Sequence, residues 1–99
     1  MDKAKAIDIV RKYKNVISPR FNGDMKVYMY GSYSKGNARP ESDIDVAVVV
    51  PELKGDWLDM SAKLWLIAPE VNYLIEPVLI DKRYASPLYD DIMRTGIAI

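Results

Sequence analysis

The sequence predicts an α/β domain of the α+β kind, in which helices pack on a small mixed β-sheet. Three segments have the apolar character of strands, and they alternate with segments whose apolar residues recur at helical spacing. The chain has 99 residues, which is enough for one hydrophobic core. We therefore expect a single domain over residues 1–99.

The first predicted helix covers residues 2–17. Asp2 near its start favours the helix dipole, and Ser18-Pro19 ends it. Turn residues at 21–24 then lead into a strand over residues 25–30. The residues on the apolar side of the helix are Ala6, Ile7, Val10, Tyr13 and Ile17.

A short helix over residues 33–38 and a second strand over residues 43–50 are expected next. Pro51 stops that strand. A further helix over residues 57–68 follows, with Asp56 as its cap and Pro69 as its end. The apolar stripe of this helix runs through Trp57 or Leu58, Ser61 or Ala62, Leu64 or Trp65, and Ala68. Its tryptophans are interpreted as core residues rather than as a platform for stacking bases.

The third strand is predicted over residues 71–80, followed by a loop and a helix over residues 88–95. Ser86 is a fair cap for this helix, with Pro87 at its first position, and Gly96 closes it. The apolar residues 97–99 can either add a last strand or dock on a partner, and the sequence leaves both open.

The segment between the first two strands carries the candidate chemistry. Gly31 allows the backbone to approach a phosphate closely, and Ser32 adds a hydroxyl at the start of a helical turn. Asp43 and Asp45 alternate with apolar residues in a strand, so both carboxylates leave the same face, about 6.7 Å apart along the backbone. Paired carboxylates suit Mg²⁺ beside a polyphosphate. The alternative is an acidic turn before an ordinary strand.

Three polar residues of the connecting loop are weaker candidates for nucleotide binding. Lys35 and Arg39 can contact phosphate oxygens, although single basic residues on a loop are often simply exposed. Ser42 can bond either the Asp43 carboxylate or the turn.

Glu76 is a lone carboxylate in an otherwise apolar strand, where burial without a partner is costly. If its strand lies beside the second strand, Glu76 faces Asp43 and Asp45 and completes a triad. Pro77 follows it, which predicts an edge strand or a bulge at that point. The alternative is a carboxylate that reaches solvent at the edge of the sheet.

This arrangement resembles the nucleotidyltransferase superfamily that includes DNA polymerase beta, and in particular its minimal nucleotidyltransferase branch. The signature of that superfamily is Gly-Ser, ten residues, and then Asp-x-Asp, which Gly31-Ser32 and Asp43-Ile44-Asp45 match. The resemblance implies the nucleotidyltransferase fold and transfer of a nucleoside monophosphate, with two Mg²⁺ ions and release of pyrophosphate. It also implies a third, usually aspartate, carboxylate as metal ligand and base, the position at which Glu76 stands.

Minimal nucleotidyltransferases resemble the antitoxins of toxin-antitoxin pairs whose partner is a helical HEPN ribonuclease. The resemblance implies ATP as donor and a partner tyrosine, or else serine, as acceptor. The short chain also favours an acceptor from another protein. The alternatives are an antitoxin that acts by binding alone, and an enzyme whose acceptor is a small molecule or RNA.

Composition narrows the classes of site that are possible. The chain lacks cysteine and histidine, which excludes disulfides and leaves carboxylates as the metal ligands. Its net charge is zero, although residues 1–39 hold nine Lys or Arg against three Asp, and no direct binding to nucleic acid is expected. Without a long apolar run or the apolar core of a signal peptide, we expect a cytoplasmic protein with no membrane segment.

Overall fold

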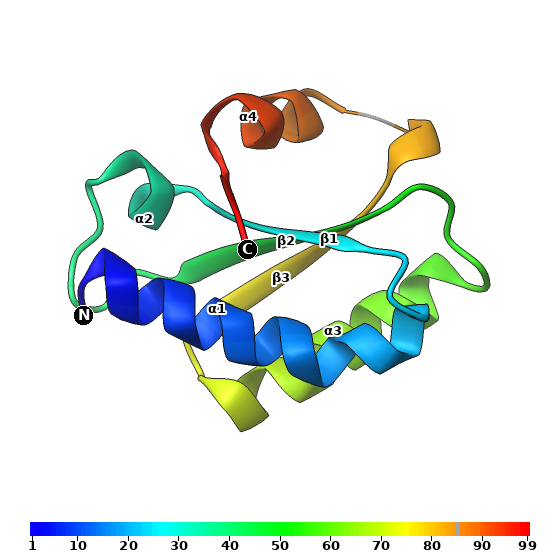
Figure 1. Cartoon of the computed structure of the whole chain (residues 1–99), viewed down its shortest axis with the longest axis horizontal. Helices are drawn as coiled ribbons and strands as arrows, with labels where there is room; N and C mark the ends of the chain where they lie inside the picture. Colours follow the sequence, from blue (N-terminus) through cyan, green and yellow to red (C-terminus); the bar gives the residue numbers. More distant parts are fainter. Residues whose placement is uncertain (85) are drawn as a thin grey trace.

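The computed structural model describes residues 1–84 and 86–99, and its centre is a mixed sheet with the strand order β3-β2-β1-β4 (Figure 1). The strands are β1 (Lys26–Tyr30), β2 (Ile44–Val50), β3 (Ile75–Asp81) and β4 (Ile97–Ala98). The helices are α1 (Lys3–Ile17), α2 (Ser32–Lys35), α3 (Trp57–Val71) and α4 (Pro87–Thr95), with 3-10 turns at Ser18–Phe21 and Lys82–Tyr84. β2 is antiparallel to β1 and parallel to β3, so the predicted mixed sheet is confirmed.

The two faces of the sheet are covered by different helices. α1 and α3 pack on one face, and α4 lies over the other (Figure 1). The first face holds the larger core, to which β2 contributes Ile44, Val46, Val48 and Val50. These four side chains are at most 2% exposed, as predicted for the side of β2 that faces away from the two aspartates. In the described part of the chain, no helix is long and apolar enough to cross a membrane.

α1 begins at Lys3, one residue later than predicted, because Asp2 is its cap. The Asp2 carboxylate accepts a hydrogen bond from the Lys5 backbone N–H at 2.8 Å. Tyr13 lies on the buried side of the helix, and its hydroxyl donates to the Leu64 carbonyl of α3 at 2.8 Å. Burial raises the pKa of this hydroxyl, so Tyr13 stays neutral and joins the two helices.

Tyr13→Phe is expected to lower the free energy of unfolding by about 1 kcal/mol, because the buried hydrogen bond from the Tyr13 hydroxyl to the Leu64 carbonyl is lost. For a domain of this size the melting temperature should fall by about 4–8 °C. Thermal unfolding followed by circular dichroism measures the change. Tyr73→Phe is the matched control, because the Tyr73 side chain is 82% exposed and its variant should melt with the parent.

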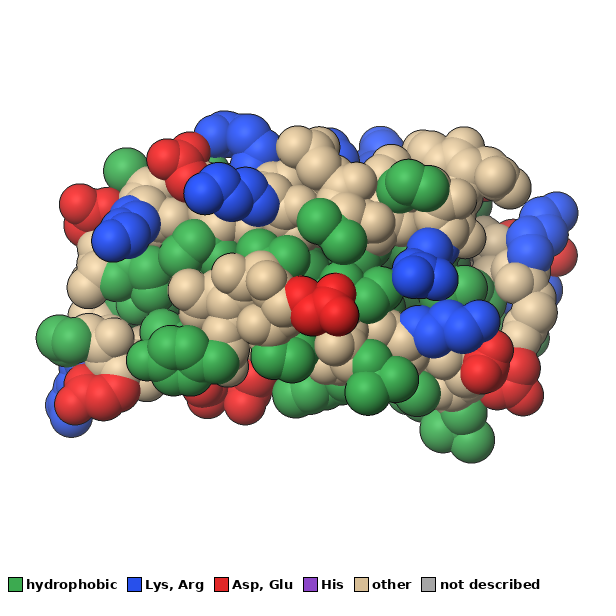
Figure 2. Space-filling model, turned by 90° about the horizontal axis from the view of Figure 1, so that it is seen from below, with side chains coloured by type: hydrophobic (Ala, Val, Ile, Leu, Met, Phe, Trp, Pro, Cys, Tyr) green, Lys and Arg blue, Asp and Glu red, His purple; other side chains and the backbone are tan. Residues whose placement is uncertain are grey.

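The prediction that the tryptophans belong to the core is wrong. α3 buries Leu64, Ile67 and Ala68, while Trp57 and Trp65 are 47% and 52% exposed. Figure 2 views the side of the molecule that carries α1 and α3, and hydrophobic side chains gather on this surface. The helix therefore has a second apolar side, which faces solvent.

The predicted boundary between α3 and β3 is also wrong. α3 continues through Pro69 to Val71, and β3 begins only at Ile75. A proline near the end of a helix removes one N–H donor but leaves the next turn intact, and the Asn72 N–H still donates to the Ala68 carbonyl. The Asn72 side chain then accepts from the Leu74 N–H at 2.8 Å, which shapes the turn before β3.

β3 is an edge strand, as Pro77 predicts. The Trp57 indole N–H donates to the Leu79 carbonyl at 3.1 Å, so this carbonyl points away from β2. Backbone groups alternate along a strand, which places the missing N–H of Pro77 on the same open side. At the other edge, β4 pairs with β1, so the apolar end of the chain adds a strand.

Candidate active site

Gly31 brings the two halves of the motif together. It follows β1 directly, and its backbone has φ +75° and ψ −145°, which only glycine adopts readily. The strand register pairs Tyr30 with Asp45, so Gly31 lies against the Asp45 carboxylate. A Cβ added at Gly31 would overlap Oδ2 of Asp45. The Gly-Ser turn and the second aspartate are therefore neighbours in space.

The helix after Gly31 is shorter than predicted. α2 covers Ser32–Lys35 rather than residues 33–38, because Gly36 adopts a left-handed conformation and its N–H closes the turn on the Ser32 carbonyl. Tyr33 is buried and anchors this turn in the core. Ser32 is partly exposed at the start of the helix, next to Gly31.

Ser42 and Arg39 organise the loop that returns to β2. The Arg39 backbone N–H donates to the Ser42 hydroxyl at 2.7 Å, and the Ser42 N–H donates to the Arg39 carbonyl at 2.9 Å. Of the two roles considered for Ser42, the structure has it bonding the turn. The Arg39 side chain is exposed, and its role in binding a nucleotide stays a prediction.

Lys35 is paired within the protein. Its Nζ lies 3.4 Å from Oδ2 of Asp91 on α4, and Asp91 also accepts from Arg94 at 3.1 Å. Both members of the Lys35–Asp91 pair are partly exposed, so the pair is weak. A phosphate that reached Lys35 would compete with Asp91 for it.

The three predicted carboxylates lie at one end of β2 and β3. Asp45 is paired in register with Glu76, and Asp43 precedes β2 by one residue. Burial and the charge of Asp43 raise the pKa of Asp45. Burial, the charge of Asp43, a hydrogen bond with it and the charge of Asp45 raise the pKa of Glu76. The carboxylates thus interact, although no three metal-binding side chains among the described residues are arranged as a ready-made metal site.

Tyr30 is a residue of this site that the sequence did not reveal. It stands opposite Asp45, which stands opposite Glu76, so the three form one row across three strands. Burial raises the pKa of Tyr30 to about 12, helped by the charges of Asp45 and Glu76. Its position just before Gly31 could have suggested that it lies near the site. The strand register that aligns it with the carboxylates cannot be read from the sequence.

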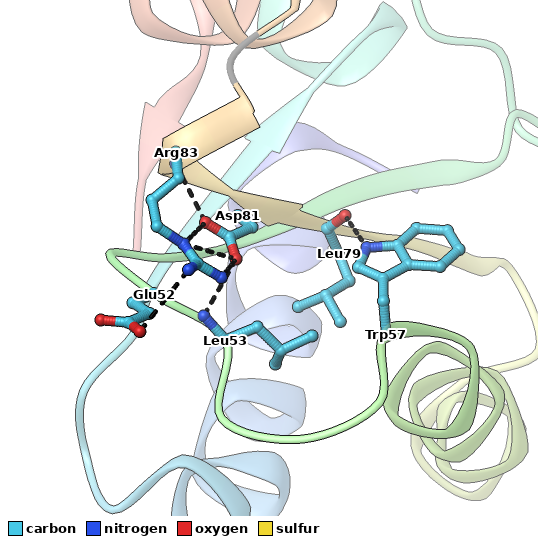
Figure 3. A network of polar contacts seen from close by, with 6 residues as sticks. All are labelled: Glu52, Leu53, Trp57, Leu79, Asp81 and Arg83. Carbon is cyan, nitrogen blue, oxygen red and sulfur yellow. Dashed lines mark hydrogen bonds and ion pairs between the residues drawn. The ribbon is translucent and has the colours of Figure 1, made fainter.

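Another acidic residue, Asp81, lies at the far end of β3 and has a structural role (Figure 3). Its carboxylate is 7% exposed and accepts from the Leu53 N–H at 3.0 Å and from Nη2 of Arg83 at 2.7 Å. The hydrogen bonds from Arg83 hold the pKa of Asp81 well below its usual range. Arg83 also lies 3.5 Å from Glu52. Through its hydrogen bond with Leu53, Asp81 therefore links the loop after β2 to the end of β3.

The chain is similar to known proteins in sequence. The sequence pattern of the family described as "Nucleotidyltransferase domain" matches residues 10–93. A protein of Methanocaldococcus jannaschii named "putative protein adenylyltransferase" is 28% identical in an alignment 98 residues long, which covers 94% of this chain and 97% of that protein.

Solved structures are similar in fold. A structure titled "putative minimal nucleotidyltransferase" aligns with all of this chain and 97% of its own, at a TM-score of 0.64 and 24% identity. A toxin-antitoxin structure with AMP-PNP aligns with 99% of this chain and 72% of its own, at a TM-score of 0.54 and 24% identity. The match of the family pattern over most of the chain is decisive: this chain belongs to the nucleotidyltransferase domain family.

Proposed function

We propose that this nucleotidyltransferase transfers AMP from ATP to a hydroxyl side chain of a partner HEPN ribonuclease and so acts as its antitoxin. The observation that carries the proposal is the row of Asp45 and Glu76, with Asp43 beside it, against the backbone of Gly31. The names of the matched relative and of the toxin-antitoxin structure support the choice of a protein acceptor.

In this proposal the partner's tyrosine, or else serine, supplies the attacking oxygen. A bond forms between that oxygen and the α-phosphorus of ATP, and the bond from the α-phosphorus to the oxygen bridging to the β-phosphate breaks. Pyrophosphate leaves with the electron pair of the broken bond. The hydroxyl proton passes to the Glu76 carboxylate, which is exposed on the edge strand and can face the acceptor. Gly31 and Ser32 hold the phosphates. The loop residues that can add contacts to the nucleotide are Lys35, Arg39 and Ser42.

The carboxylates also fit the Mg²⁺ that the family implies. Asp43, Asp45 and Glu76 offer oxygen donors. Burial, and then repulsion among these carboxylates, raises the pKa of Asp45 and Glu76, and a bound cation would offset the repulsion. We propose these three residues as the ligands of two Mg²⁺ ions. When bound, the ions would neutralise charge that develops on the phosphate oxygens.

Asp43→Asn is expected to stabilise the metal-free fold. The folded pKa values of Asp45 and Glu76 are raised above their ordinary values of 3.8 and 4.5, so the folded state binds protons more tightly than the unfolded state. The stabilising contribution is therefore full below the ordinary pKa values and is lost as the pH rises through the raised ones. At pH 7 with EDTA, removing the Asp43 charge should raise the melting temperature by about 1–5 °C.

Two further measurements define that prediction. At about pH 3 Asp45 and Glu76 are protonated and carry no charge for Asp43 to repel, so the parent and Asp43→Asn should melt together. Added MgCl₂ should raise the melting temperature of the parent at pH 7 more than that of the variant, because a ligand that binds only the folded state stabilises it. An equal Mg²⁺ response in both proteins would remove Asp43 from the metal site.

The proposed activity is tested by intact-mass measurement. The chain and the HEPN protein from its source genome are purified together and incubated with Mg²⁺ and each nucleoside triphosphate in turn. We expect the partner to gain the mass of AMP with ATP alone, and fragmentation then locates the modified hydroxyl. A tight complex without a mass change under any triphosphate would support the alternative, an antitoxin that acts by binding alone.

A further inference from the structure

α3 has an apolar strip on its solvent side that no part of the described chain covers. Leu58, Trp65 and Leu66 are 72%, 52% and 73% exposed, and Ala62 and Pro69 beside them are also exposed. These five residues, the α3 strip, lie within about 100° of one another around the helix axis. The opposite side of α3, with Leu64, Ile67 and Ala68, supplies the core. A contiguous apolar surface of this kind marks an interaction site.

The α3 strip runs beside the open edge of the sheet. α3 packs against β3, and a short turn at residues 72–74 joins the two, so they run in opposite directions. At the start of α3, Trp57 donates a hydrogen bond to Leu79, near the far end of β3. At the other end of α3, Tyr73 follows the helix and comes three residues before Glu76. The strip thus leads along the edge toward the exposed Glu76 side chain. The carboxylates are on the other face, and the edge strand alone separates them from α3.

The edge of β3 is a poor template for another strand. Pro77 offers no N–H donor there, and the Trp57 indole already occupies the Leu79 carbonyl. A partner that covers this region cannot extend the sheet through these two residues. Its contact must be made by side chains, as in a helix laid against the strip.

A cavity of about 420 Å³ lies at the Trp57 end of α3, between this helix and the far part of β3. Its lining includes Trp57, Val78, Ile80, Tyr84 and Leu88, and the Asp81–Arg83 pair forms its polar side. Tyr84 is 74% exposed, and Leu88 is 38% exposed. An open cavity of this size accepts a large apolar side chain as an anchor.

The charges of α3 help to select among possible occupants. Asp59 and Glu70 stand on α3, with Asp56 as its cap, against one basic residue, Lys63, which lies 3.3 Å from Asp59. This acidic excess of α3 gives no attraction for an anionic membrane or nucleic acid, and two copies of the helix repel each other across a symmetric contact. A helix with basic residues at the borders of its apolar face is complementary to it.

We propose that the α3 strip is the docking surface for an amphipathic helix of the acceptor protein, apolar on one face and basic at its borders. The inference rests on the proposed function, since it identifies where the modified partner binds. A helix seated on the strip runs beside the edge of β3, and the acceptor chain beyond that helix then presents a hydroxyl to Glu76 around the edge.

Fluorine NMR tests the docking surface directly. The chain contains two tryptophans, so labelling with 5-fluorotryptophan gives one signal for Trp57 and one for Trp65, assigned with Trp65→Phe. The probe is a synthetic helix of about 18 residues, with leucines on one face, lysines at its borders and a single tyrosine. One control peptide has glutamates in place of the lysines, and another has the same composition in scrambled order.

We expect the lysine peptide to shift the Trp65 signal with a dissociation constant below about 1 mM and to bind at least about tenfold more tightly than either control. A Trp65 signal that stays unchanged at about 1 mM lysine peptide, or that responds equally to all three peptides, overturns the inference.

The second test measures binding to the copurified HEPN partner. The double variant Trp65→Ser, Leu66→Ser should bind it at least about 30-fold more weakly than the parent, because buried aromatic anchors dominate interfaces. Val16→Ser, on α1 and 48% exposed, is the matched control and should bind like the parent. If the double variant binds and modifies the partner as the parent does, the docking surface is wrong and the proposed function stands. If the lysine peptide shifts Trp65 but the parent never transfers AMP, the proposed function fails and the docking surface stands.

Discussion

Asp45→Asn is expected to lower the rate of AMP transfer by at least about 10³-fold while the fold remains. Asp45 belongs to the row that joins Tyr30 to Glu76, and it lies against Gly31, so it contacts both the phosphate side and the acceptor side of the proposed site. The amide keeps the shape of the side chain but removes its negative charge. Pyrophosphate release and the intact mass of the partner measure the loss.

The control for this experiment is Asp24→Asn in the exposed turn before β1, which removes one charge outside the proposed site. It should transfer AMP at the parent's rate. Circular dichroism should show the same helix and strand content in all three proteins. Transfer by Asp45→Asn within about tenfold of the parent would contradict the assigned role of Asp45, since the loss of a group that stabilises transition-state charge costs more than that.

Gly31→Ala is expected to lower the free energy of unfolding by about 2–4 kcal/mol and to remove most of the transfer activity. Its φ of +75° and ψ of −145° lie in a region where a side chain is strained. The added Cβ also overlaps Oδ2 of Asp45, so the carboxylate must move out of its row. The stability loss is measured by urea unfolding and the activity by intact mass.

Gly23→Ala separates these two effects. Gly23 has the same φ of +75°, but an added Cβ there meets nothing within 4 Å. Its variant should lose about 1–2 kcal/mol of stability from backbone strain and keep its transfer rate. If both variants lose the same stability and both keep full activity, the close approach of Gly31 to Asp45 has no functional role.

Local chemistry explains which features of the fold could be predicted. Asp2 caps α1, and Asp56 and Ser86 cap α3 and α4, because each needs only its own side chain and the N–H groups of the next turn. Pro77 predicted an edge because a missing N–H is tolerated only there. The candidate site could likewise be predicted from the spacing of Gly31-Ser32 and Asp43-x-Asp45. β1 and β2 follow each other in the chain and pair directly, which brings the two halves of this motif together.

The errors have a different origin, because they depend on which surface of an element meets the rest of the protein. Trp65 and Leu64 are adjacent on α3, and helical spacing allowed either to be the core residue, whereas the packing against α1 and β3 selects Leu64. The pairing of Lys35 with Asp91 joins residues 56 positions apart. The alignment of Tyr30 with Asp45 and Glu76 depends on the register of two strand pairs. The roles of the predicted site residues themselves await the experiments above.

The interrupted edge of β3 also affects how the chain behaves at high concentration. Exposed strand edges are the usual starting points for aggregation, because their free N–H and C=O groups recruit further strands. Here one edge is interrupted by Pro77 and the Trp57 indole, and the other ends in β4, which has two residues. The sheet therefore presents no long free edge in its described part, and copies of the chain are expected to stay separate instead of joining edge to edge.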